Sequence, residues 1–366
     1  MGRVKEVRIS DYGFTIFQIE TQAHCNMRCA FCAYTTRKDK TSRLPDDVVF
    51  EAIDSVDPTD DKLDYLCMSH FNEALVDKRI FKFIDYAKNR GFKTLVKTNG
   101  LLFNSDAVRN QLIDGAPAYI KISFQTLNDE FFRSRGIKYS FDEYKKNIFE
   151  FLRLSLDRRC HSAITLDVAC NFLNKRKRMM RKVMGLECGE PSAPNTIGEI
   201  REDLFVFLKE LREFDSRFVF DEGKTTAFLD GVVPGYLDQS GLPITENIDL
   251  KIKHFIYSRR LTEFRPVKRG QPCGTRTLGV VSDGTVVPCC FVYDGKLVMG
   301  NIKDEPLDSI MSRNRDFIKS IKESGGSRLP GVCKVCKGAP SRRGTHILSL
   351  LRHFQNKSNK PAGGGE

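Results

Sequence analysis

The sequence contains no tryptophan, and none of its apolar runs approaches the roughly 18 residues that a membrane-spanning helix requires. Its first 14 residues, MGRVKEVRISDYGF, also lack the apolar stretch of a secretory signal peptide. These two absences predict a cytoplasmic protein with no membrane partner. The rest of the composition, 40% apolar and 29% charged over 366 residues, is that of a globular chain with one large domain and a smaller one.

Cysteine is the residue type whose distribution is most informative. The chain has 12 cysteines, although disulfides are not expected in a reducing compartment. Three of them fall within eight residues near the start, and five lie between positions 273 and 336. Clustered cysteines in a cytosolic chain indicate thiolate–metal sites, whereas scattered ones are usually buried apolar residues. We expect burial for the scattered set, which is Cys67, Cys160, Cys170 and Cys188.

The charge balance is strongly basic. A net charge of +12 favours an acidic partner, such as a phosphorylated substrate, a nucleic acid or an acidic redox protein. Part of this excess lies in the basic run at residues 175–178, which is typical of a solvated helix face. No aromatic residues interleave that run, which argues against a nucleic-acid surface.

Strand-like and helix-like segments alternate from residue 14 to about residue 220. The predicted strands are residues 14–20, 63–68, 94–96, 119–124, 163–169 and 218–220. Helices are predicted after Pro45, Asp77 and Ser105 and at residues 141–154 and 200–211. This alternation predicts a parallel sheet, either open and doubly wound or an incomplete barrel. In both, the loops at the carboxyl ends of the strands carry the site.

The first cysteine cluster lies in the loop after the first predicted strand. Cys25, Cys29 and Cys32 can bind three corners of a 4Fe–4S cubane and leave its fourth iron open to another ligand. The alternative is a structural zinc site, in which His24 or a remote cysteine would be the fourth ligand. Spacing alone leaves both interpretations open.

The segment Cys25-Asn-Met-Arg-Cys29-Ala-Phe-Cys32 resembles the signature of radical S-adenosylmethionine (SAM) enzymes, including the aromatic Phe31 before the last cysteine. The resemblance implies a 4Fe–4S cluster whose open iron binds SAM, and reductive cleavage of SAM to a 5′-deoxyadenosyl radical. It implies a partial (β/α)6 TIM-like barrel, which decides between the two sheet types above. A basic surface would also suit an acidic flavodoxin or ferredoxin as the electron donor.

Further positions match this family in order. Phe71-Asn72-Glu73 resembles the Gly-Gly-Glu motif that contacts the SAM amino group, although it has Asn72 for the second glycine. Thr98-Asn99, Ser123 and Arg135-Gly136 also resemble family positions around SAM. Taken singly, each of these is equally a turn or cap residue. The SAM-binding residues implied by the resemblance are Phe31, Asn72, Glu73, Thr98, Asn99, Ser123 and Arg135.

The second cysteine cluster resembles a SPASM/twitch extension. Asp283-Gly284 predicts a type I′ hairpin between strand-like residues 278–282 and 285–287, followed by a helix at 307–311. Arg342 stands where a full SPASM domain carries its next cysteine, so the single-cluster form is expected. The resemblance implies a second, auxiliary 4Fe–4S cluster bound by Cys273, Cys289, Cys333 and Cys336. A four-cysteine zinc site is the alternative, and Cys290 could replace Cys289 as a ligand.

The expected organisation is a radical SAM core at residues 12–225, a linker at 226–264, a SPASM/twitch domain at 265–345 and a C-terminal helix and tail at 346–366. Residues 171–199 are expected to be an insertion in the core. The tail is expected to be disordered from about residue 356.

The predicted function is that of a radical SAM oxidoreductase performing a two-electron oxidation of a small biosynthetic substrate, with phosphorylated or nucleotide-linked molecules as candidates. Since the cysteine motif begins at residue 25, no fused peptide-recognition domain is expected. A maturase acting on a separately presented peptide is the alternative. A zinc-containing nucleic-acid-binding protein is a more distant one. The sequence assigns no catalytic base.

Overall fold

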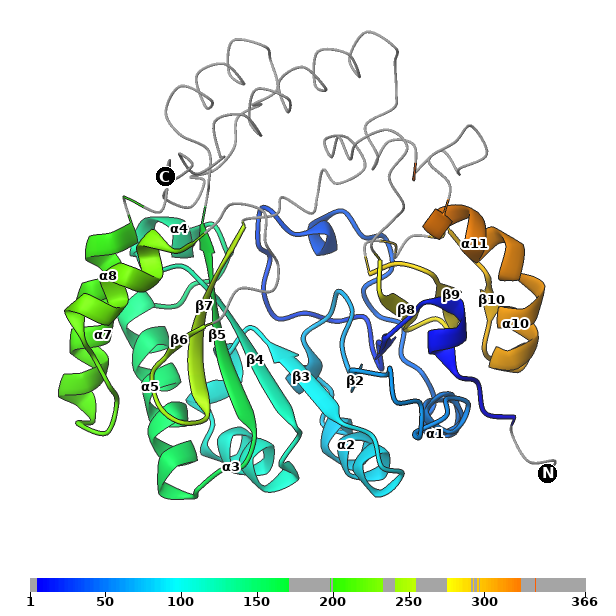
Figure 1. Cartoon of the computed structure of the whole chain (residues 1–366), viewed down its shortest axis with the longest axis horizontal. Helices are drawn as coiled ribbons and strands as arrows, with labels where there is room; N and C mark the ends of the chain where they lie inside the picture. The colour runs from blue at the N-terminus through cyan, green and yellow to red at the C-terminus, as the bar shows by residue number, and fades with distance from the viewer. Residues whose placement is uncertain are drawn as a thin grey trace, which may run out of the picture.

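The computed structural model describes residues 5–170, 198, 200–232, 241–254, 275–290, 292, 295, 297–323 and 333. Within them the backbone forms a single sheet of ten strands in the order β10-β9-β8-β1-β2-β3-β4-β5-β7-β6 (Figure 1). The strands are β1 Ile16–Ile19, β2 Tyr65–Cys67, β3 Thr94–Thr98, β4 Tyr119–Gln125, β5 Ala163–Cys170, β6 Leu242–Pro243, β7 Ile248–His254, β8 Thr277–Val280, β9 Thr285–Val287 and β10 Gly300–Asn301.

The central part of the sheet, from β8 through β1, β2, β3, β4 and β5 to β7, is parallel throughout. Parallel neighbours need crossover connections, which the helices between successive strands provide. The helices are α1 Asp46–Asp54, α2 Ile80–Asn89, α3 Asp106–Gly115, α4 Asp129–Arg133, α5 Phe141–Asp157, α7 Ile200–Phe214, α8 Glu222–Asp230, α10 Leu307–Arg313 and α11 Arg315–Glu323. This arrangement confirms the predicted α/β class and its partial barrel.

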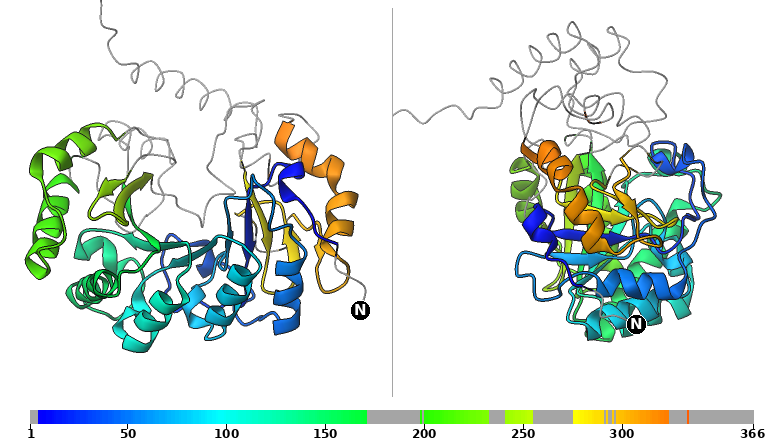
Figure 2. Two further views of the ribbon diagram at one scale, coloured as in Figure 1. Left: turned by 60° about the horizontal axis from the view of Figure 1, so that its bottom comes forward. Right: turned by 90° about the vertical axis from the view of Figure 1, so that its right-hand side faces the viewer.

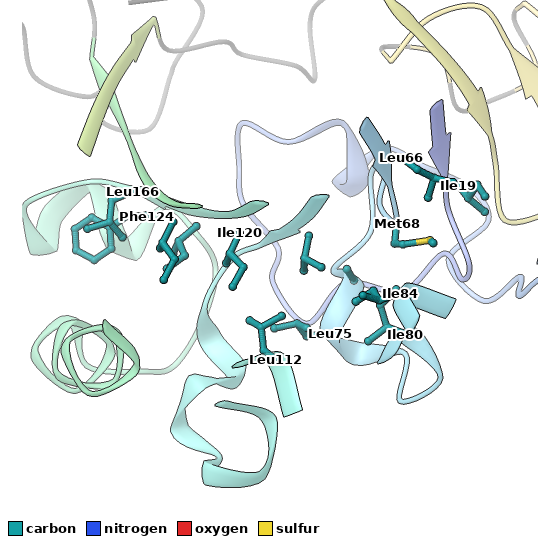
Figure 3. Close-up of a cluster of buried hydrophobic side chains, with 14 of the residues drawn as sticks. Ile19, Leu66, Met68, Leu75, Ile80, Ile84, Leu112, Ile120, Phe124 and Leu166 are labelled. Carbon is teal, nitrogen blue, oxygen red and sulfur yellow. The ribbon is translucent and has the colours of Figure 1, made fainter. Parts of the chain in front are cut away.

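The helices α1, α2, α3 and α5 follow one side of the curved sheet (Figures 1 and 2). A continuous apolar layer fills the space between strands and helices, and Figure 3 shows part of it, with Ile120, Phe124 and Leu166 from the strands and Ile80, Ile84 and Leu112 from the helices. Because side chains alternate across a strand, the residues between these apolar positions point to the opposite, inner face.

The predicted strand at residues 218–220 is wrong. Phe218 is buried but Val219 is 55% exposed, and this segment contributes only single hydrogen bonds, such as the one from the Val219 N–H to the Ile244 carbonyl. The sixth parallel strand of the core is instead β7, which pairs with β5 over its whole length. Its alternation of Ile248, Leu250 and Ile252 with charged residues is the pattern of a strand with one buried face.

The segment expected to be a linker therefore carries an integral strand of the barrel. β7 lies within residues 226–264 and extends the parallel sheet, and β6 adds to it in the antiparallel sense. At the other edge, β8 pairs with β1 in parallel, and β9 and β10 follow by antiparallel pairing. The C-terminal extension is thus joined to the core by a continuous sheet.

The hairpin between β8 and β9 forms where predicted, but its turn differs. The Gly284 N–H donates to the Val281 carbonyl, and Gly284 alone in the turn has a positive φ, of 93°. A type I′ turn would need positive φ at two residues, so this is a type I turn closed by a left-handed glycine. The expected insertion at 171–199, apart from residue 198, and the tail at 346–366 lie outside the described residues. None of the described helices is long and apolar enough to cross a membrane.

Candidate active site

The three cysteines of the first motif lie in the loop that follows β1. Cys25, Cys29 and Cys32 are partly exposed and free of disulfides. A tight turn joins the last two, since the Cys32 N–H donates to the Cys29 carbonyl at 3.0 Å. The Cys25 N–H donates to the hydroxyl of Tyr34 at 3.1 Å, which fixes the start of the loop. One short loop thus presents three thiols.

Residues 134 and 135, which follow α4, form backbone hydrogen bonds with this loop. The N–H of Arg28 donates to the Arg135 carbonyl at 3.1 Å, and the N–H of Ala30 donates to the Ser134 carbonyl at 2.8 Å. Phe31 stacks on Phe131, with ring centroids 5.6 Å apart. The aromatic residue of the motif therefore anchors the cysteine loop to α4.

The guanidinium of Arg135 is buried where several strand ends meet. It donates to the carbonyls of Ser123 and Phe124 at 3.1 and 3.0 Å and to the hydroxyl of Tyr144 at 3.1 Å. Tyr144 in turn donates to the Asn99 carbonyl at 2.7 Å. Burial raises the pKa of Cys29, and the charge of Arg135 opposes that increase. Arg135 positions the ends of β3 and β4 around the cysteine loop.

Glu73 lies in the loop after β2 and is almost fully buried. Its carboxylate accepts from the Thr98 hydroxyl and from the Asn99 N–H, each at 2.7 Å. Burial raises the pKa of Glu73. Burial and the charge of Glu73 together raise the pKa of Cys25 to about 12. Glu73, Thr98 and Asn99, which the sequence predicted as SAM-binding residues, therefore lie together near Cys25.

Asparagine side chains complete this region. Asn99 donates to the Asn26 side-chain oxygen at 2.8 Å and lies 3.9 Å from the Cys25 sulfur. Asn72 accepts from the His70 N–H at 3.0 Å. The side-chain nitrogens of Asn26 and Asn72 are buried and find no acceptor among the described residues. Unpaired buried donors of this kind near a loop with three cysteine thiols fit a site that receives a polar cofactor.

No group of three or more His, Cys, Asp or Glu side chains in the described part of the chain could hold a single metal ion. The thiolates of a cubane bind separate irons, so they need not converge on one point. The donor set of three thiols from one loop fits such a cluster.

Comparisons with known proteins decide the family. Family models match the radical SAM superfamily over residues 19–167 and an iron–sulfur cluster-binding domain, SPASM, over residues 272–337. The chain belongs to the radical SAM superfamily. Its cofactors are therefore SAM, a 4Fe–4S cluster and additional iron–sulfur in the SPASM domain. This result favours the iron–sulfur interpretation of both cysteine groups over the zinc alternatives.

Several solved structures are similar to this chain at low sequence identity. Streptococcus suis SuiB bound to S-adenosylmethionine is 12% identical at a TM-score of 0.50, with 93% of this chain and 76% of that chain covered. SuiB bound to precursor peptide SuiA gives the same identity and TM-score, with 93% and 75% covered. BtrN in complex with AdoMet and 2-DOIA is 13% identical at a TM-score of 0.44, with 90% and 94% covered. No curated protein sequence matches the chain.

Part of the auxiliary site of this radical SAM chain is described. Cys289 and Cys333 both pack on a small apolar cluster of Val281, Val287, Val292 and Leu297. Cys273 and Cys336 lie outside the described residues. A hydrogen bond with Cys289 lowers the pKa of Cys290 to about 7, with burial opposing and the charge of Lys97 adding to the decrease. Cys289 and Cys333, two of the four cysteines predicted from the sequence, therefore lie against the same apolar cluster.

A set of polar residues on the inner face of the barrel was not predicted from the sequence. Lys97, Lys121, Asp167 and Lys253 come from β3, β4, β5 and β7. His70, after β2, contacts Gln18 at 3.0 Å and the Val292 carbonyl at 2.9 Å, which links the core to the SPASM segment. Parallel strands are usually apolar on both faces, so single lysines inside apolar strands were the available signal.

Proposed function

We propose that this radical SAM enzyme removes two electrons and two hydrogens from a small molecule held on the inner face of its barrel, between the two cysteine sites. The observation that carries the proposal is on β3. Asn99, which directly follows the last residue of β3, contacts the Cys25 loop. Lys97, two positions earlier, interacts electrostatically with Cys290, the neighbour of Cys289. One strand thus faces both sites within about 7 Å of its length.

The residues around the first loop have separate tasks. Cys25, Cys29 and Cys32 would hold the 4Fe–4S cluster, and the polar set of Asn72, Glu73, Thr98, Asn99 and Ser123 would hold SAM beside it. Once bound, the cluster and SAM would supply the 5′-deoxyadenosyl radical needed to remove a hydrogen atom from the substrate. Arg135 keeps the strand ends in register, and Phe31 anchors the loop.

The second cysteine group would complete the oxidation. Cys273, Cys289, Cys333 and Cys336 would hold an auxiliary cluster, which would supply an acceptor for the second electron, and the substrate would also lose a proton. We also propose a flavodoxin or ferredoxin as the electron donor in the cytoplasm, since a net charge of +12 favours an acidic partner.

The test uses the anaerobically reconstituted enzyme with SAM, a reductant and a deuterium-labelled metabolite extract separated into small-molecule and peptide fractions. We expect deuterium in 5′-deoxyadenosine only with the small-molecule fraction, and a product lacking two hydrogens. The double variant Cys289→Ala/Cys333→Ala should still cleave SAM but form no oxidised product. Cys160→Ala, at a buried cysteine outside both groups, is the matched control.

Three results would contradict the proposal. If the wild-type enzyme produces no 5′-deoxyadenosine, the initiating chemistry is wrong. A product with an unchanged hydrogen count means that the reaction is redox-neutral. Deuterium transfer from the peptide fraction alone would make the enzyme a peptide maturase.

A further inference from the structure

The inner face of the barrel is defined by alternation along its strands. In β4, Ile120, Ile122 and Phe124 are buried in the layer beneath the helices, and Phe124 stacks on Tyr144 of α5 with ring centroids 5.6 Å apart. Lys121 and Ser123 occupy the intervening positions and are partly exposed. Because successive side chains point to opposite faces, these two residues point to the inner face.

The neighbouring strands place more charge on this face. Val96 of β3, Leu166 and Val168 of β5, and Leu250 and Ile252 of β7 belong to the apolar layer. Lys97, Asp167 and Lys253 therefore point inward with Lys121. Figure 1 shows these strands side by side in the order β3, β4, β5, β7. The four residues sum to two net positive charges.

Two of the lysines are direct neighbours. Lys97 and Lys121 are paired across β3 and β4, so their backbones lie about 4.8 Å apart. Like charges opposite one another on one face of a sheet are destabilising. Lys253 pairs with Asp167 at 2.5 Å, but within the described residues neither Lys97 nor Lys121 has a carboxylate within 4.0 Å. Burial and the charge of Lys253 lower the pKa of Lys121 to about 8.

Paired lysines of this kind carry an electrostatic free-energy cost, which a bound anion would remove. Burial and the neighbouring lysines make the ammonium form of Lys121 unfavourable, whereas Lys97 keeps its charge because, against burial, Cys67 and Tyr65 raise its pKa. An oxyanion placed between them would accept several charge-assisted hydrogen bonds at once. The repulsive cluster is therefore better suited to binding a ligand than to stabilising the fold.

We propose that Lys97, Lys121 and Lys253 form an oxyanion-binding subsite for the substrate, whose phosphate or carboxylate group they hold on the inner face. This inference rests on the proposed function and names its substrate class. Lys97 precedes Asn99 and Lys121 precedes Ser123 by two residues, so the subsite lies about 7 Å deeper than the SAM-binding strand ends. A substrate held there by its anionic group would extend its carbon skeleton toward SAM.

The test measures binding without turnover. Inorganic phosphate is titrated into the reconstituted holoenzyme in the presence of SAM, and affinity is followed by calorimetry and by the melting temperature. The variants are Lys97→Gln/Lys121→Gln, the charge-retaining Lys97→Arg/Lys121→Arg, and Lys93→Gln, an exposed lysine just before β3. We expect the Gln double variant to lose phosphate affinity by about tenfold or more. The Arg double variant and Lys93→Gln should retain it.

The outcomes separate this subsite from the catalytic function and from SAM. SAM affinity should be unchanged in all variants, whereas a parallel loss of SAM affinity would assign the lysines to the SAM carboxylate and overturn the proposal. Phosphate affinity equal in the wild type and the Gln variant, or absent in the wild type, would also overturn it. If phosphate binds as expected while no oxidised product is ever formed, the proposed reaction fails and the subsite stands.

Discussion

Arg37 forms a two-pronged ion pair with Glu20, in which each of its terminal nitrogens lies 2.7 Å from a carboxylate oxygen. The two side chains are 2% and 0% exposed. Glu20 also accepts from the N–H groups of Phe71 and Ser282, each at 3.1 Å. This one carboxylate therefore connects the end of β1, the far end of the cysteine loop, the loop after β2 and the turn of the β8–β9 hairpin.

Removing Arg37 should be severely destabilising. Arg37→Met leaves the Glu20 charge buried with no cation, so we expect a loss of about 3–5 kcal/mol in the free energy of unfolding. Arg133→Met, which breaks an exposed pair with Asp129, is the control and should cost under about 1 kcal/mol. Urea unfolding followed by circular dichroism compares the two variants. Equal losses would show that the buried pair has no special role.

Gly136 should be required for iron binding. Its φ is +65°, and a Cβ there would lie 2.6 Å from the Arg28 carbonyl oxygen, next to Cys29. Gly136→Ala should therefore displace the cysteine loop and reduce iron incorporation.

The matched control for Gly136 is Gly91→Ala. Gly91 has a φ of +94°, but its added Cβ would meet nothing closer than Pro58 at 3.9 Å. It should cost about 1–2 kcal/mol of backbone strain and leave the iron content unchanged. Iron per chain is measured after anaerobic reconstitution. Equal iron in the two variants would mean that the loop tolerates the contact.

The protonated Lys121 side chain should lower the free energy of unfolding at neutral pH. Its pKa in the folded chain is about 8 instead of 10.5, because of burial, Lys253 and Lys97, with Asp167 and Cys67 opposing. A lowered lysine pKa means that protonation disfavours the fold, so the associated stability is present above pH 10.5 and is lost as the pH falls through about 8. Lys121→Met should therefore stabilise the phosphate-free protein at pH 7 by about 1–3 kcal/mol.

The pH dependence provides the check on Lys121. The advantage of Lys121→Met over the wild type should shrink as the pH rises from about 8 toward 10.5, because the wild-type amine then loses its charge. Thermal unfolding across this range, with Lys93→Met as the control, measures the difference. A variant less stable than the wild type at pH 7 would refute the expected repulsion.

The two cysteine groups should contribute separately to the iron content. Cys25→Ala/Cys29→Ala/Cys32→Ala should remove about half of the iron and all SAM cleavage, since the auxiliary cysteines are untouched. Iron assay and electron paramagnetic resonance of the remaining cluster test this expectation. A variant with all of its iron, or none, would show that the two groups are not independent.

Much of the fold was predictable because its signals are local. The cysteine spacing, the N-cap of α3 at Ser105 and the apolar alternation in β4 and β5 depend on residues close in sequence. The predicted strand at residues 218–220 was wrong because the prediction used only such local signals. A short apolar run looks like a strand, but only pairing with a neighbour decides, and β7 has the longer alternation that pairs with β5.

The sequence by itself determined which three thiols share the first site, because three cysteines within eight residues are placed together by chain connectivity alone. What only the tertiary structure decided is which distant residues meet. Arg37 reaches Glu20, Lys97 faces Lys121 and interacts with Cys290, and His70 reaches Val292. These contacts depend on strand order, and the pairing of Lys97 with Lys121 also depends on register, since a shift of one residue would turn a strand side chain to the other face of the sheet.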